Sequence, residues 1–289
     1  MIRFDPKNPK GIVWLASFPR SGNTWTRIFL SRLLAAVAGT APGPVDLNRR
    51  NDFEASDAEP ALYRPLLGRP LGQATPAEIA AVRPQVQRTI HDKANGLVLV
   101  KTHNANTDYL GVPLITREVS AGAVYVVRNP LDVAVSFARF RAIPIDRAIA
   151  DMATPDLGSP TSAERIYWAS GSWSINVASW TARADPTILV VRYEDMLDAP
   201  LVAFDAIARH VGIGPLSPEQ LAGAIKQSSF AALSALEART GFREKPATAD
   251  RFFRAGRAGQ WREALTATQV RRVIAAHGEQ MRRFGYLPD

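Results

Sequence analysis

The sequence predicts an α/β fold, a doubly wound parallel sheet of about four to five strands flanked by helices on both faces. Two observations support this prediction. Four short runs are continuously apolar and rich in Val and Ile, which is typical of strands buried on both faces. Helical patterns separate these runs, and such an alternation is typical of parallel strands joined by crossover helices.

The four predicted strands all end in polar residues. They are residues 11–18, 96–103, 121–128 and 187–194. In sheets of this kind, ligands bind where strands end and helices begin. The polar residues at these strand ends are therefore the first candidates for a functional site.

The remaining chain divides into helical and irregular stretches. Helical patterns cover residues 25–37, 76–93, 130–140, 163–184, 200–211, 218–226 and 266–284. Three stretches lack a regular pattern, residues 39–72, 142–162 and 240–259, and we expect them to be lids and acceptor-binding loops. The length of 289 residues suits one α/β domain, 1–289.

The amino-acid composition limits the classes of ligand and functional site that this chain can have. Lys and Arg exceed Asp and Glu by 35 to 27, which gives a net charge of +8 and favours anionic ligands. The absence of cysteine excludes disulfides, thiolate catalysis and cysteine-based metal sites. No segment reaches eighteen uninterrupted apolar residues and no cleavable leader is evident, so we expect a cytoplasmic protein without a stable membrane anchor.

The first strand runs into "FPRSGNTW", residues 18–25, before a helix begins. A helix N-terminus after a tight loop directs unpaired N–H groups and a positive dipole at one point, which suits a phosphate. Arg20, Ser21 and Thr24 would add donors. The alternative is an ordinary turn capped by Ser21 or Asn23. The loop lacks the first glycine and the lysine of G-x-x-x-x-G-K-[ST], which disfavours an ATPase.

The third strand runs into a second such element, "RNPLDVAVS", residues 128–136. Asn129 is the predicted N-cap, Pro130 the first helical residue and Asp132 an acid in the first turn. Arg128 and Ser136 could together hold a second phosphate. The alternative is an ion pair for Arg128 and a polar helix face for Ser136.

Both elements resemble signatures of the sulfotransferases that use 3′-phosphoadenosine-5′-phosphosulfate (PAPS). The first resembles the 5′-phosphosulfate loop P-K-S-G-T-T-W, and the second resembles the 3′-phosphate signature R-x-P-x-D-x-x-x-S. On these motifs the chain is identified as a bacterial-looking member of the cytosolic type, which implies a P-loop-like fold. The resemblance implies that the first loop holds the 5′-phosphosulfate through Arg20, Ser21, Gly22, Asn23 and Thr24, with Trp25 on the adenine. Arg20 replaces the family's lysine, and its very high pKa limits it to charge stabilisation.

Three later segments are similar to family motifs of lower specificity. "VRYEDM" contains Tyr193, implied to lie near the nucleotide, and "SSF" contains Ser228 and Phe230, with the phenylalanine implied to pack on adenine. "FFRAGRAGQWREALT", residues 252–266, resembles the loop that closes on the 3′-phosphate in this family. The resemblance implies contacts from Arg254, Ala255 and Gly256. Ala255 stands where the family has lysine, and Gln260 where it has aspartate.

"VKTHNA", residues 100–105, ends the second strand and resembles the family's K-T-H-L-P. A histidine at a strand end is often only structural. The resemblance implies that His103 deprotonates the acceptor and that Lys101 stabilises transferred charge, which suits an imidazole near neutrality. Ser136 could help to orient the phosphosulfate. Asn104 replaces the family's leucine and predicts a more polar pocket mouth.

The predicted reaction moves a sulfuryl group from PAPS to the hydroxyl, or amine, of a small acceptor and releases PAP (3′-phosphoadenosine-5′-phosphate). No metal is expected, because His91, His210 and His277 lack ligand spacing. Two alternatives stay open, a non-catalytic nucleotide-binding module and a P-loop-type kinase. The sequence contains no recognisable nucleic-acid-binding motif, so the net positive charge alone does not indicate that the protein binds RNA or DNA. A homo-oligomer is possible, although the dimerisation motif K-x-x-x-T-V-x-x-x-E has no clear match.

Overall fold

The structure is a computed structural model that describes residues 10–39, 47–48, 54–163, 165–246 and 248–288. The chain forms two compact units, each built from separate segments. The first unit takes in the described residues of Met1–Phe18, Asp52–Tyr125 and Asp151–Val190. The second takes in those of Pro19–Asn51, Val126–Ala150 and Val191–Asp289. One domain over 1–289 stays a prediction.

A five-stranded sheet has the order β2-β3-β1-β6-β9. The strands are β1 (Gly11–Ser17), β2 (Glu54–Ala55), β3 (Leu97–Thr102), β6 (Ser120–Val127) and β9 (Ile188–Arg192). β3 pairs in parallel with both β1 and β2, and the β1 register runs from Gly11 opposite Leu97 to Ala16 opposite Thr102. Every residue of β1 is buried, which explains its continuous apolar run. The predicted α/β fold is confirmed.

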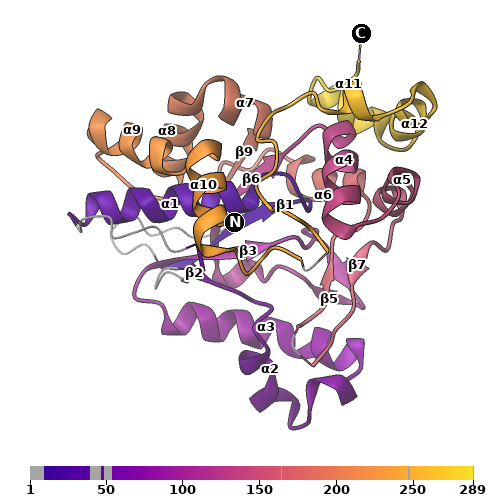
Figure 1. Ribbon diagram of the computed structural model, residues 1–289. Coiled ribbons are helices and arrows are strands. Elements are labelled where there is room, and N and C mark those ends of the chain that lie inside the picture. Colours follow the sequence, from indigo (N-terminus) through magenta and orange to yellow (C-terminus); the bar gives the residue numbers. More distant parts are fainter. Residues whose placement is uncertain (1–9, 40–46, 49–53, 164, 247, 289) are drawn as a thin grey trace. The chain divides into compact units, whose positions relative to one another are not determined.

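In the first unit, helix α3 (Pro76–Lys93) lies beside α2 (Pro60–Leu67), as Figure 1 shows. Thr75 and Glu78 form a capping box that sets the start of α3. The unit also contains α6 (Trp173–Thr181). Its short elements are η1 (Leu71–Gln73), η2 (Arg117–Val119) and the strand pairs β4 (Asp108–Tyr109) with β5 (Val112–Pro113) and β7 (Gly158–Ser159) with β8 (Trp168–Ala169).

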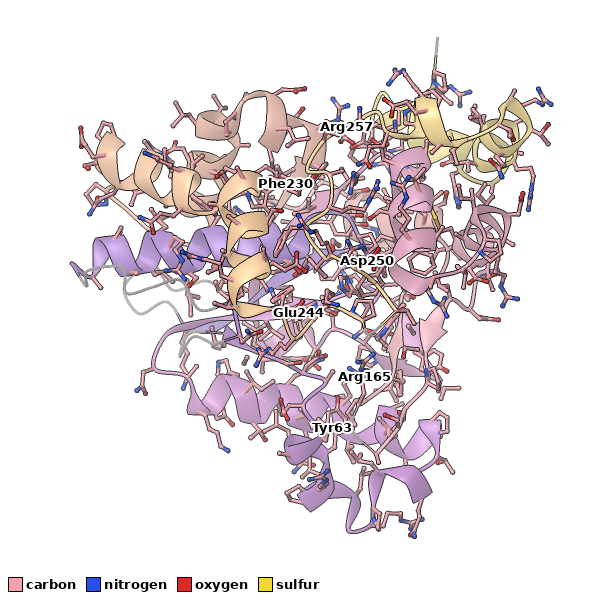
Figure 2. All side chains as sticks on the ribbon, viewed as in Figure 1. Tyr63, Arg165, Phe230, Glu244, Asp250 and Arg257 are labelled. Carbon is pink, nitrogen blue, oxygen red and sulfur yellow. The ribbon has the colours of Figure 1, made fainter. Side chains whose placement is uncertain are left out.

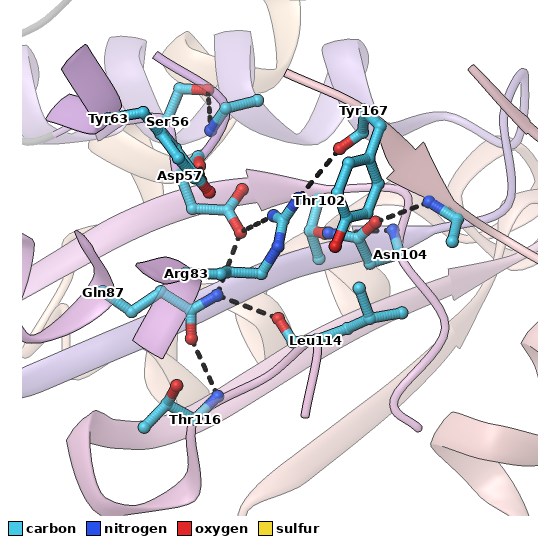
Figure 3. Close-up of polar contacts among 12 residues, drawn as sticks. Ser56, Asp57, Tyr63, Arg83, Gln87, Thr102, Asn104, Leu114, Thr116 and Tyr167 are labelled. Atoms are coloured by element: carbon cyan, nitrogen blue, oxygen red, sulfur yellow. Dashed lines mark hydrogen bonds and ion pairs between the residues drawn. The ribbon is translucent and has the colours of Figure 1, made fainter. Parts of the chain in front are cut away.

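A buried polar network ties loops of the first unit to α3 (Figure 3). Arg83 donates to the Asp57 carboxylate at 3.0 Å and to the Tyr167 carbonyl at 2.9 Å. Gln87 donates to the Leu114 carbonyl at 2.9 Å and also to Asp57. Arg83 and Asp57 are 1% and 2% exposed, so each charge depends on the other for compensation. The network therefore fixes the segments that carry Asp57, Leu114 and Tyr167 against α3.

The second unit is mainly helical. Its helices are α1 (Asn23–Val37), α4 (Pro130–Arg141), α7 (Tyr193–Asp198), α8 (Pro200–His210), α9 (Pro218–Gln227), α10 (Phe230–Thr240), α11 (Trp261–Ala264) and α12 (Ala267–Arg283). α1 lies beside α9, and α4 lies beside α11 and α12 (Figure 1). An apolar cluster that includes Leu233, Leu236, Phe242 and Phe253 packs against Trp25 of α1.

Several predicted boundaries need correction. The helix expected at 163–184 covers only Trp173–Thr181, because Trp168–Ala169 pairs as a strand with Gly158–Ser159. The stretches 39–72 and 142–162 contain α2 and α5 (Ile145–Ala153), although residues 40–46 and 49–53 lie outside the described part. The described residues of 241–259 have neither helix nor strand, as expected. No helix in the described part of the chain combines the length and apolar character needed to cross a bilayer.

Candidate active site

The loop between β1 and α1 ends at Gly22, where the helix begins without a side-chain cap from its N-cap residue. Gly22 is the N-cap with φ of 111° and has no side-chain cap hydrogen bond, and neither Ser21 Oγ nor Asn23 Oδ1 accepts a hydrogen bond from the described residues. The first turn of α1 contains no acidic residue. The alternative of a cap by Ser21 or Asn23 is therefore wrong. The first N–H groups and the positive dipole end of α1 can act on an anion.

Two details of this loop fit a phosphate group. Ser21 is 1% exposed, and its Oγ has no hydrogen-bond partner among the described residues. A buried hydroxyl without a partner is costly unless a ligand supplies one. A Cβ at Gly22 would lie 2.9 Å from the Tyr193 ring, so the backbone approaches that ring as only glycine permits. The loop thus fits the 5′-phosphate that its motif implies.

The side chains of the two signature segments meet in the second unit. Arg20 Nε donates to Ser136 Oγ at 3.2 Å, and an Arg128 nitrogen donates to the Arg20 carbonyl at 3.1 Å. Burial, and next the charge of Arg128, lower the pKa of Arg20 to about 10, so Arg20 stays cationic at neutral pH. Arg128 also lies 4.1 Å above the Tyr193 ring, and its Nε lacks a partner among the described residues.

The beginning of α4 is completed by protein groups, in contrast to that of α1. The Asn129 side chain accepts from Leu131 N at 3.0 Å, which confirms the predicted N-cap. Asp132 is 1% exposed and accepts from Gly259 N at 2.7 Å and Trp261 N at 3.0 Å. Its carboxylate therefore anchors the late loop, residues 252–266, on the first turn of α4.

The late loop carries the last predicted cofactor residues. Gly256 has φ of 58°, and a Cβ there would lie 2.1 Å from the Phe230 ring. Figure 2 labels Phe230 at the start of α10 and Arg257 in the loop. Arg254 is exposed and donates to Gln260 at 3.3 Å, and Ala255 is half-buried. Glycine is thus required where the loop crosses Phe230.

Two of the three predicted aromatic groups contact each other. The Trp25 and Tyr193 ring centroids are 5.7 Å apart, edge to face, and burial raises the pKa of Tyr193. Ser228 is fully buried, and its hydroxyl donates to the Ala224 carbonyl at 2.9 Å. The Ser228 hydroxyl therefore hydrogen-bonds to a main-chain carbonyl of α9, the helix that it ends. A contact between Ser228 and the nucleotide stays a prediction.

Glu244 is a site residue that the sequence did not indicate. It accepts from Thr24 Oγ1 at 3.3 Å and from Arg27 at 2.5 Å. It lies in an irregular stretch 220 positions from Thr24, so no local pattern could have identified it. A carboxylate thus contacts the loop that the motif assigns to an anion.

Lys101 and His103 belong to the first unit, at the end of β3. His103 Nδ1 lies 2.8 Å from the carbonyl oxygen of the buried Ser17. Asn176, fully buried on α6, donates to the His103 carbonyl at 3.2 Å. The Trp168 ring is edge-on to the imidazole at 6.3 Å. The Ser17 contact orients the imidazole, and Asn176 holds the main chain of His103. Asn176 is a second residue that sequence reasoning missed.

Asn104 does not form the polar pocket mouth that its type predicts. It is 2% exposed, and its side-chain oxygen accepts from Ala169 N at 2.9 Å (Figure 3). Its carbonyl accepts from Trp180 Nε1 at 3.0 Å. The amide therefore joins the segment after His103 to β8.

Within the described residues, no group of three or more His, Cys, Asp or Glu side chains could hold a metal ion. His277 is 2% exposed on α12, and burial lowers its pKa to about 4. His91 contacts the neighbouring Asp92 at 2.8 Å.

Solved structures share the fold of this chain. The structure of mouse sulfotransferase SULT7A1 complexed with PAP matches with a TM-score of 0.60, 20% identity and coverage of 94% of this chain and 84% of that chain. A structure of retinol dehydratase with retinol and PAP matches with a TM-score of 0.62, 20% identity and coverage of 94% and 82%. The α/β fold of these proteins is the fold described above.

Comparison with related protein sequences indicates the same family. Flavonol 3-sulfotransferase of Flaveria bidentis is 25% identical over 280 residues, 90% of this chain and 78% of that protein. Cytosolic sulfotransferase 12 of Arabidopsis thaliana is 28% identical over 181 residues, 59% of this chain and 54% of that protein. The sequence profile of the Sulfotransferase domain matches residues 10–285. With nearly its whole length matched, this chain belongs to the sulfotransferase domain family.

Proposed function

We propose that the residues described above transfer the sulfuryl group of PAPS to a small hydroxylated acceptor, or to an amine, and release PAP. Family membership gives the reaction class, that of a PAPS-dependent sulfotransferase. The observation that carries the assignment to these residues is the contact between Arg20 and Ser136, 116 positions apart. Because Arg128 also bonds to the Arg20 carbonyl, both signature segments contribute to one cationic site.

The second unit would hold the cofactor. When bound, PAPS supplies a sulfuryl group attached to a phosphate that can leave. The open N-terminus of α1 and the unpaired Ser21 hydroxyl support binding of the 5′ end. The 3′-phosphate would be held by Arg128, Ser136, Arg254 and the main chain at Ala255 and Gly256. The adenine would contact Trp25, Tyr193 and Phe230.

His103 would act as the general base through Nε2. A carbonyl oxygen can only accept, so the 2.8 Å contact with Ser17 O requires the proton of the neutral ring to lie on Nδ1. The lone pair is then on Nε2, which can take the acceptor proton as the acceptor oxygen attacks. The Ser17 carbonyl also stabilises the imidazolium that forms, because it accepts from a more acidic N–H.

Fixed positive charge would provide most of the remaining catalysis. In-line transfer spreads negative charge over the moving group and the departing phosphate. Arg20 stays protonated with a pKa of about 10, and Lys101 adds a second cation from the end of β3. Neither residue needs to exchange a proton in this scheme.

The acceptor would be a small hydroxylated molecule. The Flaveria relative is named for a flavonol, and one matched structure holds retinol, so hydroxylated acceptors of this size are compatible with related chains. We also propose a cytoplasmic location, as in the relative named cytosolic. A homo-oligomer and a bacterial source stay predictions from the sequence.

The test is His103→Ala, assayed for PAPS-dependent sulfation of a panel of phenols and alcohols. We expect turnover to fall by about 10²–10⁴-fold, the usual contribution of a general base. PAP affinity, measured by calorimetry, should stay unchanged, because His103 lies outside the proposed cofactor residues. His91→Ala is the control and should retain both properties. Full turnover in His103→Ala would exclude this base, and a wild-type protein that binds no PAP would exclude the function.

A further inference from the structure

The Arg20 guanidinium lies in a corner formed by two phenyl rings. Its central carbon is 4.4 Å from the Phe140 ring centroid and 4.5 Å from that of Phe252. The two rings are nearly perpendicular, at 86°, with centroids 6.0 Å apart. Each ring therefore presents a face to the same cation. Arg20 occupies the position at which the family motif has lysine.

Each wall of this corner is held by contacts of its own. Phe140 follows Ser136 by four positions on α4, so the ring and the hydroxyl that bonds Arg20 share one helix face. The Phe252 backbone N–H donates to the Glu237 carboxylate at 2.6 Å. The Phe252 ring also contacts Phe242 with centroids 4.9 Å apart. The corner is thus a built feature of the second unit.

Such a corner favours arginine over lysine. The face of a phenyl ring attracts a cation, and two faces also exclude water from two sides of the charge. A guanidinium is planar and weakly hydrated, so it can lie on a ring and still donate from its edge, as Arg20 Nε does to Ser136. An ammonium is compact and strongly hydrated, and two apolar walls would cost it solvation.

We propose that Phe140 and Phe252 are positioning residues that hold the Arg20 guanidinium as a fixed charge and make arginine, not lysine, the residue this site requires. The inference rests on the proposed function, because it assumes that Arg20 stabilises charge on the transferred group. Phe252 lies two residues before Arg254, so the same segment would position one cation and present another.

The first experiment compares turnover in four variants. Phe252→Leu removes the aromatic face and keeps apolar bulk, and we expect kcat to fall about 10-fold while the acceptor KM and PAP affinity change by less than about twofold. Phe252→Tyr keeps the face and should retain kcat. Phe284→Leu is the matched control, because that half-buried ring follows α12, outside the proposed site, and also faces an arginine, Arg283, at 5.5 Å. Arg20→Lys should lose about 30-fold in kcat.

A double variant separates positioning from general damage. If Phe252 acts through Arg20, then adding Phe252→Leu to Arg20→Lys should slow turnover no further. A direct readout without substrate is the NMR signal of the Arg20 Nε–H in the full chain. The two rings should shift this signal upfield, Phe252→Leu should reduce the shift, and Phe252→Tyr and Phe284→Leu should preserve it.

The outcomes distinguish the two proposals. Additive losses in the double variant, or an Nε–H signal that ignores Phe252, would overturn the positioning role while leaving sulfation intact. A slow Arg20→Lys enzyme beside a fully active Phe252→Leu enzyme would do the same. Wild-type turnover in Arg20→Ala would instead remove the charge-stabilising role on which the inference rests.

Discussion

The beginnings of α1 and α4 both follow a buried strand, yet they are completed in different ways. α1 begins at Gly22 without a side-chain cap, and the buried Ser21 hydroxyl beside it lacks a partner in the described residues. α4 begins with a side-chain cap from Asn129, and the carboxylate of Asp132 lies in its first turn. One helix begins without a side-chain cap, and the other begins with a cap from its own N-cap side chain.

The difference suggests two ways of binding an anion. At α1, backbone N–H groups and the dipole would provide most of the interaction with the 5′ end of the cofactor. At α4, the Asp132 carboxylate offsets the positive end of the helix dipole, and its oxygens accept hydrogen bonds from Gly259 N and Trp261 N. Binding of the 3′-phosphate there would depend on side chains, chiefly Arg128 and Ser136. Substitutions of side chains should therefore affect the second site more than the first.

The largest expected effect on nucleotide affinity comes from Arg128→Met. Loss of the guanidinium should weaken PAP binding by about 100-fold, because a charged hydrogen-bonding group is removed from the 3′-phosphate. AMP lacks that phosphate, so its affinity should change by less than about threefold. Calorimetric titration of both nucleotides measures the difference. Equal losses for PAP and AMP would contradict separate sites.

A charge-matched control is available on α8. Arg209 is exposed and paired with Asp205, and Arg209→Met removes the same charge from the protein. Both nucleotide affinities should stay at the wild-type level in this variant. If PAP affinity fell here as well, general electrostatic attraction, and not the local Arg128 contact, would explain the first result.

A smaller effect is expected from Ser21→Ala. The variant removes one neutral donor from a loop whose backbone N–H groups remain, so PAP and AMP should both lose about fivefold in affinity. Parallel losses measured by calorimetry would place Ser21 at the 5′ end, which both nucleotides share. A loss confined to PAP would show that the two helix beginnings have been assigned to the wrong phosphates.

The sequence predicts the completed helix end better than the open one. Asn129, Pro130 and Asp132 are local cap signals, and the structure confirms each of them at the start of α4. α1 begins two residues before the predicted position, and neither polar candidate caps it. The start of α1 has no side-chain cap that a local sequence pattern could reveal, so only the resemblance to the family motif identified it as a candidate site.

The contacts that organise the site could not be predicted, because they join distant segments. Phe252 contacts Arg20, and Glu244 contacts Thr24, from irregular stretches without periodicity. Asn176 contacts the His103 carbonyl from helix α6, 73 positions away in the chain. Resemblance to a motif identifies a residue at one position in the chain. It does not identify the partner that orients that residue.

The smallest expected effect concerns Glu244, which brings negative charge to the open end of α1. Its carboxylate contacts Thr24 and Arg27 and raises the pKa of Arg20 against the larger lowering effects, so it offsets part of the local positive charge. Glu244→Gln keeps an acceptor for Thr24 and removes the charge. PAP affinity should therefore rise about threefold at low salt, with the gain disappearing near 0.5 M salt because the charges are screened. Glu219→Gln, an exposed residue in the first turn of α9 outside the proposed site, is the control and should leave affinity unchanged. A loss of PAP affinity in Glu244→Gln would mean that the carboxylate organises Thr24 for binding, and the α1 end would then depend on side chains as the α4 end does.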